Sequence, residues 1–285
     1  MKLLRSAYDY IVLIRPINSI MMGLAVIVGE IAVFNGIPRA FEIIFGFLVG
    51  FFLTASSMVL NDIVDIEIDR INMPNRPIAA GRISINAAKK YAIIIMVLGL
   101  IFSALLSIGA ILIAISALLV SILYNFKGKR MGLLGNIMVA YCVAIPFFFG
   151  GIAVSNAINE KILAFFILAL LATTGREIIK GIADIEGDER KGIRTLALKY
   201  GRRRASIIAV LFYIIAIAIT PIPLIIRVVG IWYLVLIIIV NIGLIYSSVR
   251  ILRKQDKETA MEVKKESLFW MLLALLAFLM DGISI

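Results

Sequence analysis

The sequence predicts an all-α protein of one domain that crosses a membrane nine times. Apolar residues make up 62% of the 285 positions, whereas soluble domains have about 45–50%. The mean hydropathy is +1.06. A helix that spans a bilayer needs about 17–25 mainly apolar residues, and nine segments of the chain meet this requirement.

The nine predicted spans follow one another along the whole chain. They are residues 17–34, 41–60, 87–108, 109–125, 133–154, 162–179, 205–226, 228–249 and 267–284. The third and fourth spans are expected to form a tight hairpin around Ile108-Gly109. Pro146 predicts a kink or an end in the fifth span, and Pro221 and Pro223 predict the same in the seventh, because proline interrupts helical hydrogen bonding.

The basic residues predict how the chain is oriented. With nine spans, all but three of the 29 Lys and Arg residues lie on the side of the N-terminus, the exceptions being Arg39, Lys161 and Arg227. Because basic loops stay in the cytoplasm, we expect a multi-pass protein of the cell membrane with a cytoplasmic N-terminus and an external C-terminus. The net charge of +11 then indicates membrane lipids and anionic substrates as partners, and no nucleic acid.

Histidine is missing from the sequence, and Cys142 is the single cysteine. The composition therefore excludes histidine metal ligands, histidine general bases and an internal disulfide.

Two acidic motifs stand out against this apolar background. Asp62, Asp65 and Asp69 have the spacing of one helix face, and so do Asp184 and Asp188. Carboxylates next to hydrocarbon persist only with a partner or a function. Oxygen ligands without His or Cys suit a hard cation, which predicts Mg²⁺ as the cofactor.

Basic residues follow each acidic motif within one or two helical turns. Acids beside bases at a membrane interface fit a diphosphate that is held through Mg²⁺. Both motifs contain Asp-Ile-Glu-x-Asp, which indicates a pseudo-repeat with halves of roughly 1–125 and 126–285. The alternative is that both loops are solvated and contain ordinary ion pairs.

These motifs resemble those of a known family. Asn61-Asp62-x-x-Asp65-x-x-x-Asp69 is similar to the first aspartate-rich motif of the UbiA-type intramembrane prenyltransferases, and Asp184-x-x-Gly187-Asp188 is similar to the second. The string Arg15-Pro16-x-Asn18 before the first span adds to the resemblance. It implies a magnesium-dependent helical bundle that binds an isoprenyl diphosphate between the motifs. The prenyl chain would pass to an acceptor in a central cavity open sideways to lipid.

The resemblance also implies roles for individual residues. Catalysis and metal binding would fall to Asp62, Asp65, Asp69, Asp184 and Asp188. The expected contacts to diphosphate or substrate are Asn18, Asn61, Arg76, Tyr124, Lys127, Lys129, Lys180 and Lys191. The family's Tyr-x-x-x-Lys element has a different spacing here, which leaves Lys127 and Lys129 as alternatives. The alternative for Arg76, Lys180 and Lys191 is that they only mark the cytoplasmic side of the membrane.

Within this family, the sequence as a whole most resembles archaeal members that act on a lipid phosphate. They transfer the geranylgeranyl group of geranylgeranyl diphosphate to geranylgeranylglyceryl phosphate for ether lipids. The alternative within the family is prenylation of a 4-hydroxybenzoate-like ring in quinone synthesis. An alternative from another class is a secondary transporter, whose charged groups usually lie near the bilayer midplane.

Overall fold

The structure is a computed structural model that describes every residue except 1, 35–36, 156–157, 186–194 and 284–285. The described residues form helices and connecting loops, with no strand among them. The helices are α1 Lys2–Leu13, α2 Pro16–Phe34, α3 Ala40–Val64, α4 Ile66–Asn72, α5 Ile85–Leu106, α6 Ile108–Phe126, η1 Gly128–Arg130, α7 Leu133–Ser155, α8 Glu160–Ala183, α10 Leu196–Tyr200, α11 Arg202–Ile219, α12 Ile222–Ile225, α13 Ile231–Arg253 and α14 Lys257–Ile283. The predicted all-α class is confirmed.

Eight stretches of helix in the described chain are long and apolar enough to cross a membrane, so the predicted count of nine is not confirmed. They correspond to the first eight predicted segments, with α11 and α12 together forming the seventh. The last predicted span falls in α14, which packs beside α2, α8 and α13. Its 27 residues run along the bundle beside these helices, and its uncharged stretch lies between Glu266 and Asp281.

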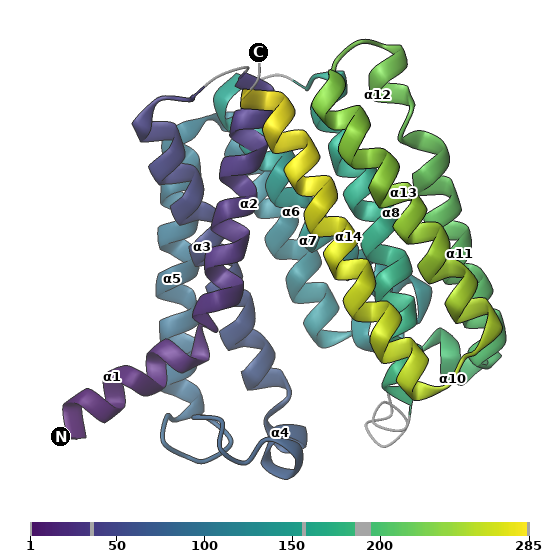
Figure 1. Ribbon diagram of the computed structural model, residues 1–285. Coiled ribbons are helices and arrows are strands. Elements are labelled where there is room, and N and C mark those ends of the chain that lie inside the picture. The colour runs from purple at the N-terminus through teal and green to yellow at the C-terminus, as the bar shows by residue number, and fades with distance from the viewer. Residues whose placement is uncertain (1, 35–36, 156–157, 186–194, 284–285) are drawn as a thin grey trace.

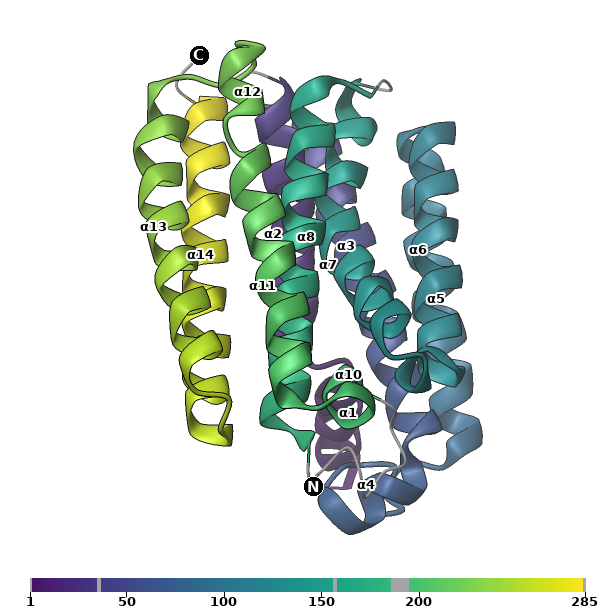
Figure 2. The ribbon, with the colours of Figure 1, turned by 90° about the vertical axis from the view of Figure 1, so that its right-hand side faces the viewer.

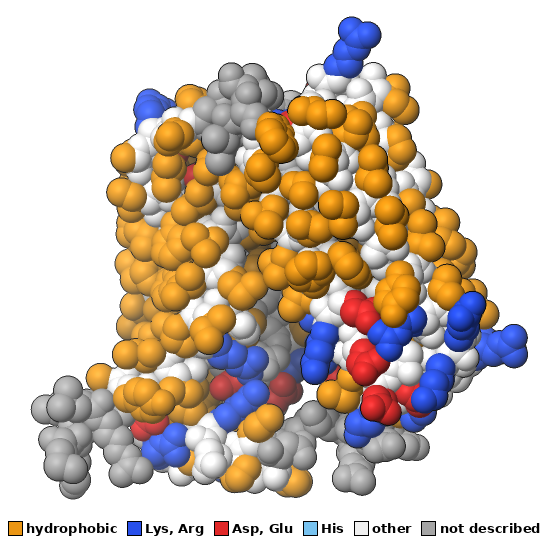
Figure 3. Space-filling model, viewed as in Figure 1, with side chains coloured by type: hydrophobic (Ala, Val, Ile, Leu, Met, Phe, Trp, Pro, Cys, Tyr) orange, Lys and Arg blue, Asp and Glu red, His pale blue; other side chains and the backbone are white. Residues whose placement is uncertain are grey.

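The long helices run side by side in one bundle (Figures 1 and 2). The N-terminus lies at the lower end of these views and the C-terminus at the upper end, so the termini lie at opposite ends of the bundle. The lower ends of α3 and α8, which lead into the two acidic motifs, lie at the same end. Apolar side chains cover the middle of the face in Figure 3, and most charged side chains gather towards the lower end.

Local chemistry explains where several helices begin and end. Ser107 separates α5 from α6 in an extended conformation, and its hydroxyl accepts a hydrogen bond from the Ala110 amide at 3.0 Å. Such a cap satisfies one of the free amides at a helix N-terminus. A single residue joins α5 to α6 and the two helices pack against each other, so the predicted tight hairpin is confirmed. The helix α11 ends at Ile219, just before Pro221. By contrast, Pro146 lies inside α7 and does not end it.

Glycines allow α2 and α7 to touch through their backbones. A Cβ atom on Gly29 would lie 2.2 Å from the Phe147 carbonyl oxygen, and one on Gly150 would lie 2.1 Å from that of Val26. Small residues at helix contacts are typical of membrane proteins, because they let backbones approach closely. This contact fixes one edge of the cavity described next.

Candidate active site

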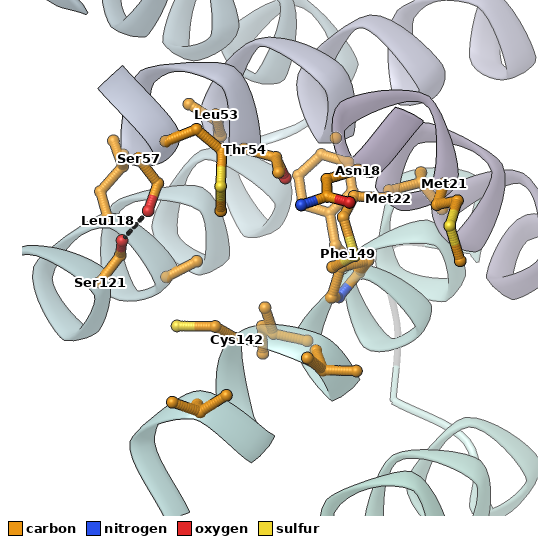
Figure 4. Close-up of a pocket in the computed structure, with 18 of the residues that line it drawn as sticks. Asn18, Met21, Met22, Leu53, Thr54, Ser57, Leu118, Ser121, Cys142 and Phe149 are labelled. Carbon is orange, nitrogen blue, oxygen red and sulfur yellow. Dashed lines mark hydrogen bonds between the residues drawn. The ribbon is translucent and has the colours of Figure 1, made fainter. Parts of the chain in front are cut away.

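A cavity of about 570 Å³ lies among α2, α3, α6 and α7, with residues of α8 and α14 closing it. Figure 4 shows the side chains that these helices present to it. Its polar lining consists of Asn18, Thr54, Ser57, Asn61, Ser121, Tyr124, Asn125, Thr173 and Arg176, and the rest is apolar apart from Cys142. Arg176 is the one charged residue in the described lining. The cavity can therefore take a largely hydrocarbon ligand with a polar end.

One face of α3 forms the long wall of the cavity. Val49, Leu53, Ser57 and Asn61 all line it at intervals of four residues, which places them on one side of the helix. From Val49 to Asn61 the helix rises about 18 Å at about 1.5 Å per residue. This wall changes from apolar to polar and ends directly before Asp62.

Hydrogen bonds close the polar end of the cavity between α3 and α6. The hydroxyls of Ser57 and Ser121 are 2.5 Å apart (Figure 4). One turn further, the Asn61 amide donates to the Asn125 side-chain oxygen at 2.8 Å. These contacts hold Asn61 at the junction between the cavity and the first acidic motif.

The first motif is a network of buried acids and partly exposed bases. Asp62 is 4% exposed and accepts hydrogen bonds from Arg15 at 2.7 Å and Arg76 at 3.1 Å. The same nitrogen of Arg76 contacts Asp69, which is 7% exposed, at 2.5 Å. Two guanidinium groups therefore balance these two carboxylates at the lower end of the bundle. The predicted contact of Arg76 to phosphate stays a prediction.

Arg15 reaches this network from a strained backbone position. Its φ angle is +45°, in the left-handed region that side chains other than glycine seldom adopt. It connects α1 to Pro16, the first residue of α2. Strain of this kind persists when the surrounding structure holds it, and it is frequent at functional sites.

Lys129 joins the loop after α6 to the first motif. Its ammonium group lies 2.5 Å from a carboxylate oxygen of Asp65, the residue between α3 and α4. Lys127, the other alternative from the sequence, is exposed at the C-terminus of α6. The contact brings Lys129 to an acidic residue, while the predicted role of either lysine towards a diphosphate stays a prediction. Tyr124 and Asn18, both predicted substrate contacts, line the cavity.

The second motif begins where α8 ends. Asp184 is the exposed residue that follows the last turn of α8, and Asp188 and Lys191 lie outside the described residues. Lys180 contacts Glu177 at 3.0 Å, and Arg176 contacts the other oxygen of the same carboxylate at 3.1 Å. Among the residues that the structure describes, no three acidic side chains lie close enough together to hold a metal. The predicted five-aspartate metal site therefore stays a prediction.

Three residues lie at the site but were not among the predicted site residues: Arg15, Asn125 and Arg176. Arg15 belongs to the string Arg15-Pro16-x-Asn18, and Asn125 directly follows Tyr124, but the spacing gave no partner for either. The signal for Arg176 is a charge in the last turns of an apolar span, which indicates a cavity or an interface.

The fold and this site define a helical membrane protein built to bind an amphiphile. The largely apolar cavity ends beside a set of acids and bases. A molecule with a long hydrocarbon chain and a charged head group requires such a site. Residues 22–276 match the UbiA prenyltransferase family, and the chain belongs to this family.

Similar proteins cover nearly the whole chain. A protein of Methanocaldococcus jannaschii named digeranylgeranylglyceryl phosphate synthase is 38% identical, with 97% of this chain and 96% of the relative covered. A protein of the same name from Methanosphaera stadtmanae is 35% identical, with coverages of 96% and 99%.

Solved structures share the fold. One described as giving insights into digeranylgeranylglyceryl phosphate synthase in membranes has a TM-score of 0.89 and 37% identity, covering 99% of this chain and all of that one. A UbiA homolog from Archaeoglobus fulgidus bound to GPP and Mg²⁺ has a TM-score of 0.67 and 18% identity, with coverages of 95% and 99%. The second likeness concerns the fold alone.

Proposed function

We propose that this protein transfers a geranylgeranyl group from geranylgeranyl diphosphate to geranylgeranylglyceryl phosphate. The product is digeranylgeranylglyceryl phosphate, a precursor of archaeal ether lipids. Two relatives above 30% identity that cover almost the full chain bear the name of this synthase. The structural observation that carries the proposal is the α3 wall, which leads from Val49 to Asn61 and ends beside Asp62.

This wall is apolar at one end and polar at the other, as the prenyl donor is. The hydrocarbon chain would lie along Val49 and Leu53, and the diphosphate would lie beyond Asn61 at the first acidic motif. Arg76 and Lys129 already lie at this motif, within 3.1 Å of its carboxylates. Guanidinium and ammonium groups bind phosphate oxygens strongly, so both would contact the diphosphate.

The donor atoms of the first motif fit a magnesium ion. Asp62, Asp65 and Asp69 offer only carboxylate oxygens, the ligands that Mg²⁺ prefers, and Asp184 and Asp188 would complete the set from the end of α8. Mg²⁺, when bound, supplies positive charge to a departing diphosphate. Binding of Mg²⁺ in the A. fulgidus homolog supports the use of a divalent metal in this family.

The residues of the cavity would keep water from the reacting carbon. The allylic C–O bond breaks and the electron pair leaves with the diphosphate, so the prenyl chain becomes a delocalised cation. The acceptor hydroxyl then forms the new ether bond and releases its proton. Water in the cavity would capture the cation, and the apolar lining excludes it. Faces of Tyr124 and Phe149, which line the cavity, would stabilise the cation by roughly 0.5–2 kcal/mol each.

The end of the bundle that carries the acidic motifs would face the cytoplasm. The concentration of Lys and Arg at this end supports that orientation. Labelling of a cysteine introduced at exposed Asn75 or Ile37 in intact cells would test it. The proposal requires that a membrane-impermeant reagent reach only the cysteine at Ile37.

The reaction is tested with purified protein, Mg²⁺ and labelled geranylgeranyl diphosphate. Geranylgeranylglyceryl phosphate and 4-hydroxybenzoate are offered as acceptors in parallel. We expect a labelled diether phosphate and one pyrophosphate per transfer. A prenylated ring with no diether would assign the protein to quinone synthesis, and binding without pyrophosphate release would favour a transporter.

A further inference from the structure

A second, smaller chamber lies beside the main cavity, among α2, α8, α13 and α14. Its volume is about 180 Å³, and its described lining contains no charged side chain. Its polar residues are Thr173, Thr220 and Asn241, and the Asn241 amide donates to the Thr220 hydroxyl at 2.8 Å. An apolar cavity of about 150 Å³ is large enough to bind benzene. The chamber therefore has room for a segment of a hydrocarbon chain.

The two chambers share a wall that can adapt to a chain passing between them. The residues that line both are Met21, Met22, Val143, Thr173, Leu268 and Met271. Three of these six are methionines, whose unbranched side chains adjust to the shape of a ligand. Hydrocarbon can therefore extend from the main cavity into the second chamber.

One face of α8 extends from a positively charged side chain to the second chamber. Arg176 lines the main cavity, Thr173 lines both, and Ala169 and Phe165 line the second chamber. Their spacing of three or four residues places them on one side of the helix. From Arg176 to Phe165 the helix rises about 16 Å. This α8 face thus has a charged end and an apolar end, as the α3 wall does.

The charged end of the α8 face has unused hydrogen-bonding capacity. The Nε atom of Arg176 and the hydroxyl of Thr173 are buried without a hydrogen-bond partner among the described residues. Glu177 is shared between Arg176 and Lys180, so these three residues carry a net charge of about +1. A buried donor without a partner costs free energy, and an anionic group at Arg176 would remove that cost.

We propose that the α8 face and the second chamber bind the lipid acceptor. Arg176 contacts its phosphate, Thr173 hydrogen-bonds to its glycerol oxygens, and its alkyl chain extends past Ala169 into the second chamber. The inference rests on the proposed function, whose acceptor has these three parts. The donor then occupies the α3 wall, and the two substrates meet in the main cavity between α3 and α8.

The first test concerns the phosphate. Initial rates are measured for wild type, Arg176→Gln and Arg176→Lys, varying each substrate in turn. We expect Arg176→Gln to raise the KM of the acceptor about 10-fold or more with the KM of the donor within about twofold, and Arg176→Lys to restore part of the loss, because it keeps the charge. The preference of wild type for geranylgeranylglyceryl phosphate over geranylgeranylglycerol should largely disappear in Arg176→Gln.

The second test concerns the alkyl chain. Ala169→Leu places a larger side chain at the half-buried wall of the second chamber, and Ala104→Leu at an exposed position of α5 is the matched control. Acceptors with a 20-carbon and a 5-carbon chain are compared in the assay and by calorimetric titration without donor. Ala169→Leu should bind the long acceptor about 10-fold more weakly and the short one as wild type does. Ala104→Leu should resemble wild type.

The outcomes separate this inference from the proposed function. A wild-type protein that transfers no prenyl group would overturn both. If wild type is active but Arg176→Gln raises the KM of the donor instead, or Ala169→Leu weakens both acceptors equally, the α8 face does not bind the acceptor and only this inference is overturned. Comparing two acceptors on one variant keeps the test valid even where the variant is less stable.

Discussion

Arg76 offers a direct test of the charge network at the first acidic motif. Replacing it with Gln removes two contacts, at 3.1 Å to Asp62 and 2.5 Å to Asp69. Asp62 keeps Arg15 as a partner, whereas Asp69 retains no basic partner among the described ion pairs. The carboxylate side chains are 5% and 9% exposed, and Arg76 is 27% exposed, so solvent screens the contacts only in part.

The expected loss of stability follows from these contacts. A hydrogen bond to a charged group contributes about 1.5–3 kcal/mol, and removing one partner of a buried ion pair costs about 3–5 kcal/mol. Because Arg76 is partly exposed, we expect Arg76→Gln to lose about 2–3 kcal/mol. In detergent-solubilised protein this corresponds to a lower Tm by about 4–10 °C.

Magnesium should reverse much of this loss. Once Arg76 is gone, the charge of Asp69 is uncompensated and Arg15 alone balances Asp62. A cation that binds the folded protein stabilises it. Mg²⁺ should therefore raise the Tm of Arg76→Gln by more than that of wild type. Arg76→Gln combined with Asp69→Asn should be more stable than Arg76→Gln alone and should respond less to Mg²⁺.

Arg39 provides the matched control at the other end of the bundle. It pairs with the buried Glu42 at 2.5 Å, where we expect no metal. Mg²⁺ should not restore an Arg39→Gln variant. An unchanged Tm in Arg76→Gln, or equal effects of Mg²⁺ on the two variants, would refute the reasoning about the acidic motif.

Four further predictions concern the site and the fold. Asp65→Asn and Asp184→Asn should each lower the rate of pyrophosphate release about 100-fold or more, and full activity in either would remove that residue from the metal site. Asp184→Asn, at an exposed position, should leave Tm nearly unchanged, whereas Asp65→Asn also loses the ion pair with Lys129 and should lower Tm. Chelation with EDTA should abolish prenyl transfer and added Mg²⁺ should restore it; activity that survives chelation would exclude a required divalent ion. Gly150→Ala should cost about 1–3 kcal/mol in chemical denaturation, because its Cβ meets the α2 backbone at 2.1 Å, and wild-type stability would show that α2 and α7 can separate. Ser107→Ala should cost about 1 kcal/mol, whereas Ser107→Asn, which keeps a capping oxygen, should stay close to wild type.

Much of the fold could be predicted from hydropathy. In a bilayer the backbone must satisfy its own hydrogen bonds, so an apolar segment of sufficient length becomes a helix. The boundaries of α2 and α6 lie within one residue of the predicted ones, and the α5–α6 hairpin lies where it was expected. Within the seventh span, α11 ends before Pro221, because proline has no amide hydrogen to donate. The ninth predicted span lies in α14 and is not confirmed as a membrane span.

The candidate acidic residues could also be predicted from the sequence, because carboxylates at helical spacing beside hydrocarbon usually have a partner or a function. Their partners were not. Arg15 and Lys129 are distant from the first motif in sequence, and the turn at Arg15 and the loop at η1 decide that they reach Asp62 and Asp65. The local pattern carries no information about such pairings, because they depend on how whole helices pack.

The sequence by itself determined the membrane-spanning helices, the polarity of the two ends and the residues available for chemistry. Only the tertiary structure decided which faces of α3 and α8 line a cavity, and therefore that Asn61 and Arg176 face the same space. Hydropathy along an almost uniformly apolar helix does not distinguish the side that contacts lipid from the side that contacts a ligand. Close contacts such as Gly150 against α2 set each helix's rotation, and with it the shape of the cavity.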